Sequence, residues 1–312
     1  MNNKAKGYAL GAIAAATYGM NPLFALPLYA DGMNPDSVLF FRYLFAIPLV
    51  GLMLKARGRS LRVERRALLP LAGMGLLVAL SSLALFLSYN YIAAGIASTM
   101  LFVYPILVAL IMTLVFHERI TLQTVVCIAL ALVGIGLLYR SADGATLSLA
   151  GTVFVMVSAL AYALYIVGVN RPGLKHIATL NVTFYVLLFG LVLFVARFAC
   201  GVAFTLPHTW YLWGCVVALA VFPTAISFLC TTSAIQYIGS TPTAILGALE
   251  PVTAVFFGVT VFGESLTFRE SVGLALIIAA VTLVVAGGRL SAYLVRFRKL
   301  FPRLPLRRRK NA

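Results

Sequence analysis

One acidic residue lies where its chemistry is least expected. The stretch "LGALEPVTAVFFGVTVFGESLT", residues 246–267, is nearly all apolar around Glu250, while the other seven acidic residues lie in short polar connectors or at the ends of apolar segments. A carboxyl group in an apolar helix costs several kcal/mol unless it faces a polar interior, is protonated or has a partner. Glu250 is therefore a candidate proton-coupling or ligand-bonding group, and the structural alternative is a neutral acid that holds its helix to a nearby tyrosine or serine.

Other polar side chains fall near the middle of apolar segments. We predict that they line a substrate cavity, with tyrosines as walls that carry one polar tip and serines as orienting donors. The structural alternative is helix packing, because serine and threonine in such helices often bond backbone carbonyls. The predicted cavity residues are Tyr18, Asn21, Ser81, Ser82, Tyr104, Ser158, Tyr162, Thr224, Ser227, Thr231 and Glu250.

Four prolines interrupt the same apolar segments. Each proline frees a backbone carbonyl one turn earlier. Such breaks usually face protein or a water-filled cavity, because a freed carbonyl needs a partner. The predicted helix breaks are Pro22, Pro105, Pro223 and Pro251.

The sequence lacks the common motifs of metal-dependent and nucleotide-dependent enzymes. It has no H-E-x-x-H pair and no G-x-x-x-x-G-K-[ST] phosphate loop, so we predict neither a metal site nor a built-in ATP motor. The three histidines lie in loops or at segment ends: His117, His176 and His208. The four cysteines show no C-x-x-C spacing and are interpreted as packing residues: Cys127, Cys200, Cys215 and Cys230. We therefore expect no catalytic residues and no cofactor.

The elements that must position these residues are membrane-spanning helices. The chain has 312 residues, of which 62% are hydrophobic and only 10% charged, and its mean hydropathy is +1.03. Apolar runs of about 20 residues, enough for a helix to cross a bilayer, recur throughout. We predict an all-α membrane protein with ten transmembrane helices, the first an uncleaved helix and not a signal peptide. They cover residues 7–29, 36–54, 67–89, 94–116, 121–139, 148–169, 177–199, 210–235, 239–262 and 268–288.

The net charge of +16 is explained by orientation. With both termini in the cytoplasm, twenty basic residues are cytoplasmic, including those of a basic tail at 289–312, and two are external. This split follows the positive-inside rule and predicts contact with anionic headgroups; we do not expect nucleic-acid binding. Arg42 and Arg197 fall inside predicted helices near their outer ends. We expect both to reach the headgroups, the alternative for Arg42 being attraction of an anionic substrate.

The chain repeats itself. A shift of 146 residues places 89–121 on 235–267 without a gap, and the spacing from Pro105 to Glu118 equals that from Pro251 to Glu264. Each half, 7–139 and 148–288, then holds five spans. Because five is odd, the second half enters the membrane from the opposite side, which makes the halves inverted repeats. Such repeats are a known basis for alternating access in transporters, although channels also contain them.

The segments "YPILVALIMTLVFHERIT" and "LEPVTAVFFGVTVFGESLT" resemble the EamA-type permeases of the drug/metabolite transporter superfamily. The resemblance covers nearly all of residues 7–288. It implies a transporter that exports or exchanges small metabolites, such as amino acids, or drugs. We expect a secondary transporter of small organic metabolites that works as an exporter. Uptake remains the alternative direction, and a non-transporting scaffold or receptor the alternative class. We expect a small-molecule substrate, a monomer or homodimer, and a bacterial inner-membrane location.

Overall fold

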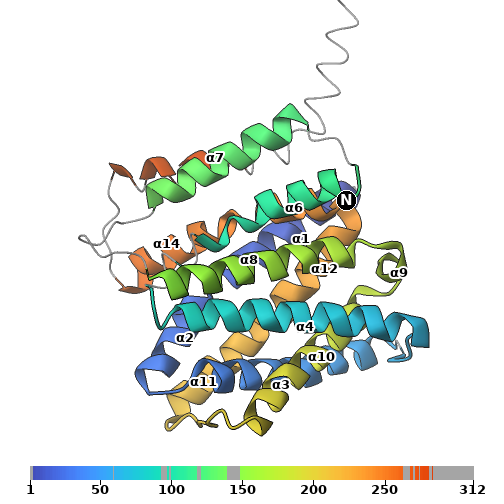
Figure 1. The fold of residues 1–312 in the computed structure, drawn as a ribbon, viewed down its shortest axis with the longest axis vertical. Helices are drawn as coiled ribbons and strands as arrows, with labels where there is room; N and C mark the ends of the chain where they lie inside the picture. Colours follow the sequence, from blue (N-terminus) through green and yellow to red (C-terminus); the bar gives the residue numbers. More distant parts are fainter. Residues whose placement is uncertain are drawn as a thin grey trace, which may run out of the picture.

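The computed structural model describes residues 3–58, 60–92, 97, 100–117, 121–138, 148–262, 268–269, 271–273, 275–280 and 283. Throughout this part of the chain the regular structure is helical (Figure 1). The predicted tail at 289–312 and the paired residues Glu118 and Glu264 lie outside the described residues. Within them, six helical stretches are long and apolar enough to cross a membrane, so the protein is multi-pass.

The first half of the chain contains α1 (Asn3–Tyr18), α2 (Asn21–Ala30), α3 (Pro35–Ala56), α4 (Arg65–Ser88), α6 (Tyr104–Leu114) and α7 (Leu122–Leu138). The second half contains α8 (Leu149–Val169), α9 (Pro172–Lys175), α10 (Thr179–Ala199), α11 (Trp210–Ala220), the π-helical turn η1 (Val221–Ile226), α12 (Ser227–Ile238), α13 (Ser240–Leu246) and α14 (Leu249–Phe262).

Local sequence sets several helix starts. The Asn34 side chain accepts a hydrogen bond from the Ser37 backbone N–H at 2.8 Å, and Pro35 occupies the first position of α3. Asparagine at the cap followed by proline is a favoured start, because proline has no N–H to leave unsatisfied there. Ser148 caps α8 in the same way, accepting from the Gly151 N–H.

The predicted proline breaks coincide with changes in helix geometry. The first span divides at Gly19–Met20, so Pro22 lies in the first turn of α2. Pro105 lies in the first turn of α6, and Pro223 lies within η1. The span that contains Pro251 divides between α13 and α14. Each break leaves backbone groups to be satisfied by neighbouring elements.

The long helices pack in pairs that join the two halves. The closest partners are α4 with α8 and α1 with α12, and α10 packs on α3 and α4 (Figure 1). Glycines allow this closeness: a Cβ on Gly7 would lie 2.6 Å from Ile238, and one on Gly151 would lie 2.9 Å from Ile92. Small residues at such contacts let membrane helices approach closely.

Polar contacts join the end of α2 and the start of α3 to the end of α10 and the connection that follows it. Asp36 pairs with Arg197, and the Asp31 carboxylate lies 2.7 Å from His208. The Thr205 N–H donates to the Ser37 hydroxyl at 2.9 Å. Arg197 binds Asp36, because the carboxylate at the start of α3 lies within its reach, and its side chain remains partly exposed, so its contact with the headgroups stays a prediction.

Candidate functional site

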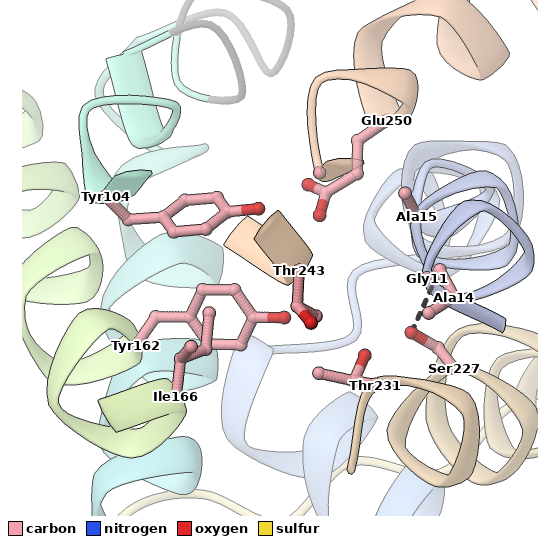
Figure 2. Close-up of a pocket in the computed structure, with 11 residues that line it drawn as sticks. Gly11, Ala14, Ala15, Tyr104, Tyr162, Ile166, Ser227, Thr231, Thr243 and Glu250 are labelled. Carbon is pink, nitrogen blue, oxygen red and sulfur yellow. Dashed lines mark hydrogen bonds between the residues drawn. The ribbon is translucent and has the colours of Figure 1, made fainter. Parts of the chain in front are cut away.

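Glu250 faces a small cavity between six helices (Figure 2). The room for centres of water molecules is about 10 Å³, which corresponds to about one water. A small organic solute does not fit in this conformation. The lining residues are Gly11, Ala14 and Ala15 of α1, Tyr104 of α6, Tyr162 and Ile166 of α8, Ser227 and Thr231 of α12, Thr243 of α13, Gly247, and Glu250 of α14.

The position of Glu250 follows from the break between α13 and α14. The Glu250 N–H donates to the carbonyl of Gly247 at 2.8 Å, which closes a tight turn in front of α14. The carboxyl group then points toward the Tyr104 hydroxyl, across from Thr243 (Figure 2). Hydroxyl groups can donate to a carboxylate or accept from a carboxylic acid. In this conformation the Tyr104 and Thr243 hydroxyls already donate to backbone carbonyls, so toward Glu250 they can act only as acceptors for a protonated carboxyl group.

Tyrosine rings form one wall of the cavity. Tyr104 meets Tyr162 edge to face, with ring centroids 4.9 Å apart. Behind them Tyr18 stacks on Tyr162 at 6.1 Å. The Tyr104 hydroxyl donates to the carbonyl of Ala244 at 3.1 Å. This bond holds the Tyr104 ring against α13, just before the break between α13 and α14.

The serines hold helices together. Ser158 of α8 donates to the carbonyl of Ser81 on α4 at 2.7 Å. Ser227 of α12 donates to the carbonyl of Ala14 on α1 at 3.0 Å. The Ser82 hydroxyl lies 3.3 Å from that of Tyr43. Cross-helix hydrogen bonds of this kind stabilise membrane helix pairs by about 1 kcal/mol each.

Of the residues predicted for the cavity, five line it in this conformation: Tyr104, Tyr162, Ser227, Thr231 and Glu250. The others are buried behind the wall or between helices: Tyr18, Asn21, Ser81, Ser82, Ser158 and Thr224. Their contact with substrate stays a prediction.

Arg42 departs from its sequence-based prediction. The sequence predicts that its side chain reaches the headgroups, but in the structure it is fully buried. Its guanidinium donates to the Thr224 hydroxyl, to the Asn21 amide oxygen at 2.9 Å and to the Pro223 carbonyl at 3.0 Å. The α1–α2 break and η1 supply these acceptors within reach of α3, which is why the side chain turns inward. In the described part of the chain, no carboxylate is paired with it.

The π-helical turn explains part of this cluster. Thr224 donates to the carbonyl of Leu219, five residues earlier, at 2.7 Å. Its oxygen remains available to accept from Arg42. Turns of this type are frequent at functional sites. The Asn21 amide nitrogen, by contrast, is buried without a hydrogen-bond partner.

Six of the lining residues are not predicted by the sequence. Gly11, Ala14, Ala15, Ile166 and Gly247 carry no polar side chain and gave no signal. Thr243 could have been found, because "STPTA" at 240–244 is a polar cluster inside an apolar run.

The chain is similar to a family of transporters and to individual proteins described as transporters. The model of the EamA-like transporter family matches residues 5–140 and again residues 149–286. A protein from Archaeoglobus fulgidus described as an uncharacterized transporter is 29% identical over 276 residues, 88% of this chain and 94% of its own length. The uncharacterized transporter YcbK of Bacillus subtilis is 23% identical over 255 residues, 78% of this chain and 81% of its own.

A solved crystal structure shares the fold. It superposes with a TM-score of 0.77 at 19% sequence identity and covers 91% of this chain and 98% of its own. Two matches to one family model, together spanning nearly the whole chain, account for the doubled architecture. The chain belongs to the EamA-like transporter family and is a multi-pass membrane transporter.

Proposed function

We propose that the protein is a secondary transporter of the bacterial inner membrane that exports small organic metabolites, such as amino acids or drug-like solutes. It works by alternating access, with ten spans arranged as two inverted five-helix repeats at 7–139 and 148–288. Both termini are cytoplasmic. The substrate binds where Glu250 meets the tyrosine wall, and uptake by the same fold is the alternative direction.

Reciprocal contacts between the halves support the inverted repeat. Ser158 of α8 bonds the Ser81 carbonyl of α4, and the equivalent helices α1 and α12 are joined by Ser227 and Ala14. Gly7 packs on Tyr237 and Ile238, as Gly151 packs on Tyr91 and Ile92. In both pairs of contacts, the residue of one half is replaced by its equivalent from the other half. A twofold relation between the halves produces such reciprocal contacts.

The observation that carries the proposal is the Glu250 cavity itself. It lies at a helix break, is lined by helices of both halves, and combines one carboxyl group with several hydroxyls and a wall of tyrosine rings. Discontinuous helices at a repeat interface are typical substrate sites in secondary transporters.

The small size of the cavity also fits alternating access. A site with room for about one water must open before it can take a metabolite. The polar ties of Asp36 to Arg197 and of Asp31 to His208 lie on the outer side in the proposed orientation. Breaking them is the change we expect when the site opens outward.

The test is solute counterflow in liposomes with the purified protein, using a panel of amino acids and small cationic drugs. Wild type is compared with Glu250→Gln, with and without an imposed pH gradient. Glu64→Gln is the matched control, because Glu64 is exposed at the start of α4 and lies outside the Glu250 cavity.

We expect wild type and Glu64→Gln to respond to the gradient, and Glu250→Gln to carry solute without responding. If all three move solute equally and none senses pH, Glu250 is a structural hydrogen-bonding residue and proton coupling is wrong. Absence of counterflow for every solute in the wild type would favour the scaffold or receptor alternative. Loading solute on one side at a time decides between export and uptake.

A further inference from the structure

A second and larger cavity lies apart from the Glu250 site. Its volume is about 560 Å³, within the range of about 300–1,000 Å³ that is usual for ligand sites. It opens between the ends of α1, α3, α10 and α12 that face the cytoplasm in the proposed orientation, and it shares no lining residue with the Glu250 cavity.

The charged groups of this cavity are both cationic. Lys6 of α1 and Arg57 at the end of α3 line it, and no acidic residue is among its described lining residues. The Lys6 ammonium lies over the Tyr237 ring, 5.4 Å from the centroid, which fixes its position at the wall. The cavity is therefore electrostatically suited to an anion.

Two neutral polar groups on the wall, Thr179 and Gln236, already bond each other. Thr179 donates to the side-chain oxygen of Gln236 at 2.7 Å, and the Gln236 amide nitrogen donates to the carbonyl of Ile177 at 3.0 Å. A neutral polar ligand would have to displace these bonds. An anionic ligand can bind to Lys6 and Arg57 without displacing these hydrogen bonds.

Apolar side chains lie one turn deeper than the cations. Leu10 follows Lys6 by four residues on α1, and Met53 precedes Arg57 by four on α3, so each pair shares a helix face. Leu229 of α12 completes this apolar wall. The cavity thus has a charged end at the membrane boundary and an apolar end inside the bilayer.

We propose that this cavity binds an anionic phospholipid, with its phosphate diester between Lys6 and Arg57 and an acyl chain against Leu10, Met53 and Leu229. Basic pockets between helices on the cytoplasmic side are suited to such headgroups. A soluble organic phosphate shares the headgroup chemistry but would leave the apolar wall unfilled. The bilayer is therefore the source that fits both ends.

The first test is native mass spectrometry of the purified chain with phosphatidylglycerol or phosphatidylcholine. We expect phosphatidylglycerol to bind wild type, and Lys6→Gln/Arg57→Gln to weaken it about 30-fold, since each basic group near a membrane surface contributes about fivefold. Lys4→Gln/Arg66→Gln removes the same charge at exposed positions outside the cavity and should bind like wild type. Equal loss in both double variants, or equal binding of the two lipids, overturns the proposal.

The second test needs no variant. Cys230 lines the cavity and is half-buried, whereas Cys200 is exposed elsewhere. We expect phosphatidylglycerol, but not phosphatidylcholine, to slow alkylation of Cys230 and leave Cys200 unchanged. If millimolar glycerol 3-phosphate protects Cys230 as well as the lipid does, the site takes a soluble phosphate and the lipid proposal is wrong. No protection by any of the three probes also overturns it.

Discussion

Gly247 shows how much the Glu250 cavity depends on a residue with no side chain. A Cβ at this position would overlap the Tyr104 hydroxyl and would lie 2.9 Å from the Ala244 carbonyl that the hydroxyl bonds. The glycine therefore lets a tyrosine from α6 reach the connection in front of α14. Its removal should disturb Tyr104 and the Glu250 turn together.

We expect Gly247→Ala to lower the free energy of unfolding by about 1–3 kcal/mol, because the added methyl group overpacks a closed contact. Thermal unfolding in detergent measures the loss. Adding Tyr104→Phe should restore part of it, since the clashing hydroxyl is then gone. Gly214→Ala is the control, because a Cβ there would meet nothing within 4 Å; equal losses in both glycine variants would contradict the argument.

Arg42 is a second buried residue that joins separate elements, because its guanidinium donates to acceptors on α2 and η1. Arg42→Gln should lower stability by about 2 kcal/mol or more, because it leaves buried acceptors on α2 and η1 unsatisfied. Arg197→Gln, at the more exposed outer pair, should cost less than about 1 kcal/mol. Thermal unfolding of the two variants side by side gives the comparison, and a larger loss for Arg197→Gln would show that the cluster is not structural.

The sequence predicts some residues of the candidate site and not others. Glu250, Tyr104 and Tyr162 could be found because a polar group in an apolar run is unusual. Arg42 was found but misplaced, since its depth along a helix does not reveal whether a break and a π-helical turn supply acceptors nearby. Gly247 could not be found, because its importance lies in the space that Tyr104 occupies.

At the scale of elements, α1 is defined by the small residues on one face. Gly7 and Gly11 of α1 meet α12 and α13, and Gly19, directly after α1, meets α14. A Cβ on Gly19 would lie 2.5 Å from the backbone oxygen of Glu250. The break in the first span and the start of α14 are thus in direct backbone contact.

We expect Gly19→Ala to reduce solute counterflow and thermal stability together, because the atom it meets is a backbone oxygen that cannot move alone. Gly11→Ala should be milder, since its nearest neighbour is the end of the flexible Leu246 side chain. Counterflow and unfolding are measured on both variants. A larger effect at Gly11 would mean that α1 does not move or pack as a unit with α14.

The elements themselves were largely predictable, and their irregularities were not. Helix spacing and apolar length predicted the long helices such as α4 and α8. Proline predicted interruptions, but it reports only a lost hydrogen bond. Whether the chain then divides, as at Gly19–Met20, or widens into η1 depends on the neighbours that satisfy the freed groups.

At the scale of the whole molecule, the proposed orientation places the polar ties at one face and the cationic cavity at the other. Cys200, exposed after α10, then lies outside the membrane, and Cys230 lies toward the cytoplasm. A membrane-impermeant maleimide applied to intact cells should label Cys200 and not Cys230. Cys200→Ser should abolish the signal, and labelling of Cys200 only after lysis would reverse the orientation.

The pairing of α1 with α12 and of α4 with α8 has a consequence for biosynthesis. The ribosome delivers α1 and α4 to the membrane before their principal neighbours have been made. Until α8 and α12 arrive, the carbonyls of Ala14 and Ser81 have no serine to bond, and Gly7 lacks the residues of α12 on which it packs. The first half therefore cannot complete its packing until α12 has been made, when most of the chain has been translated.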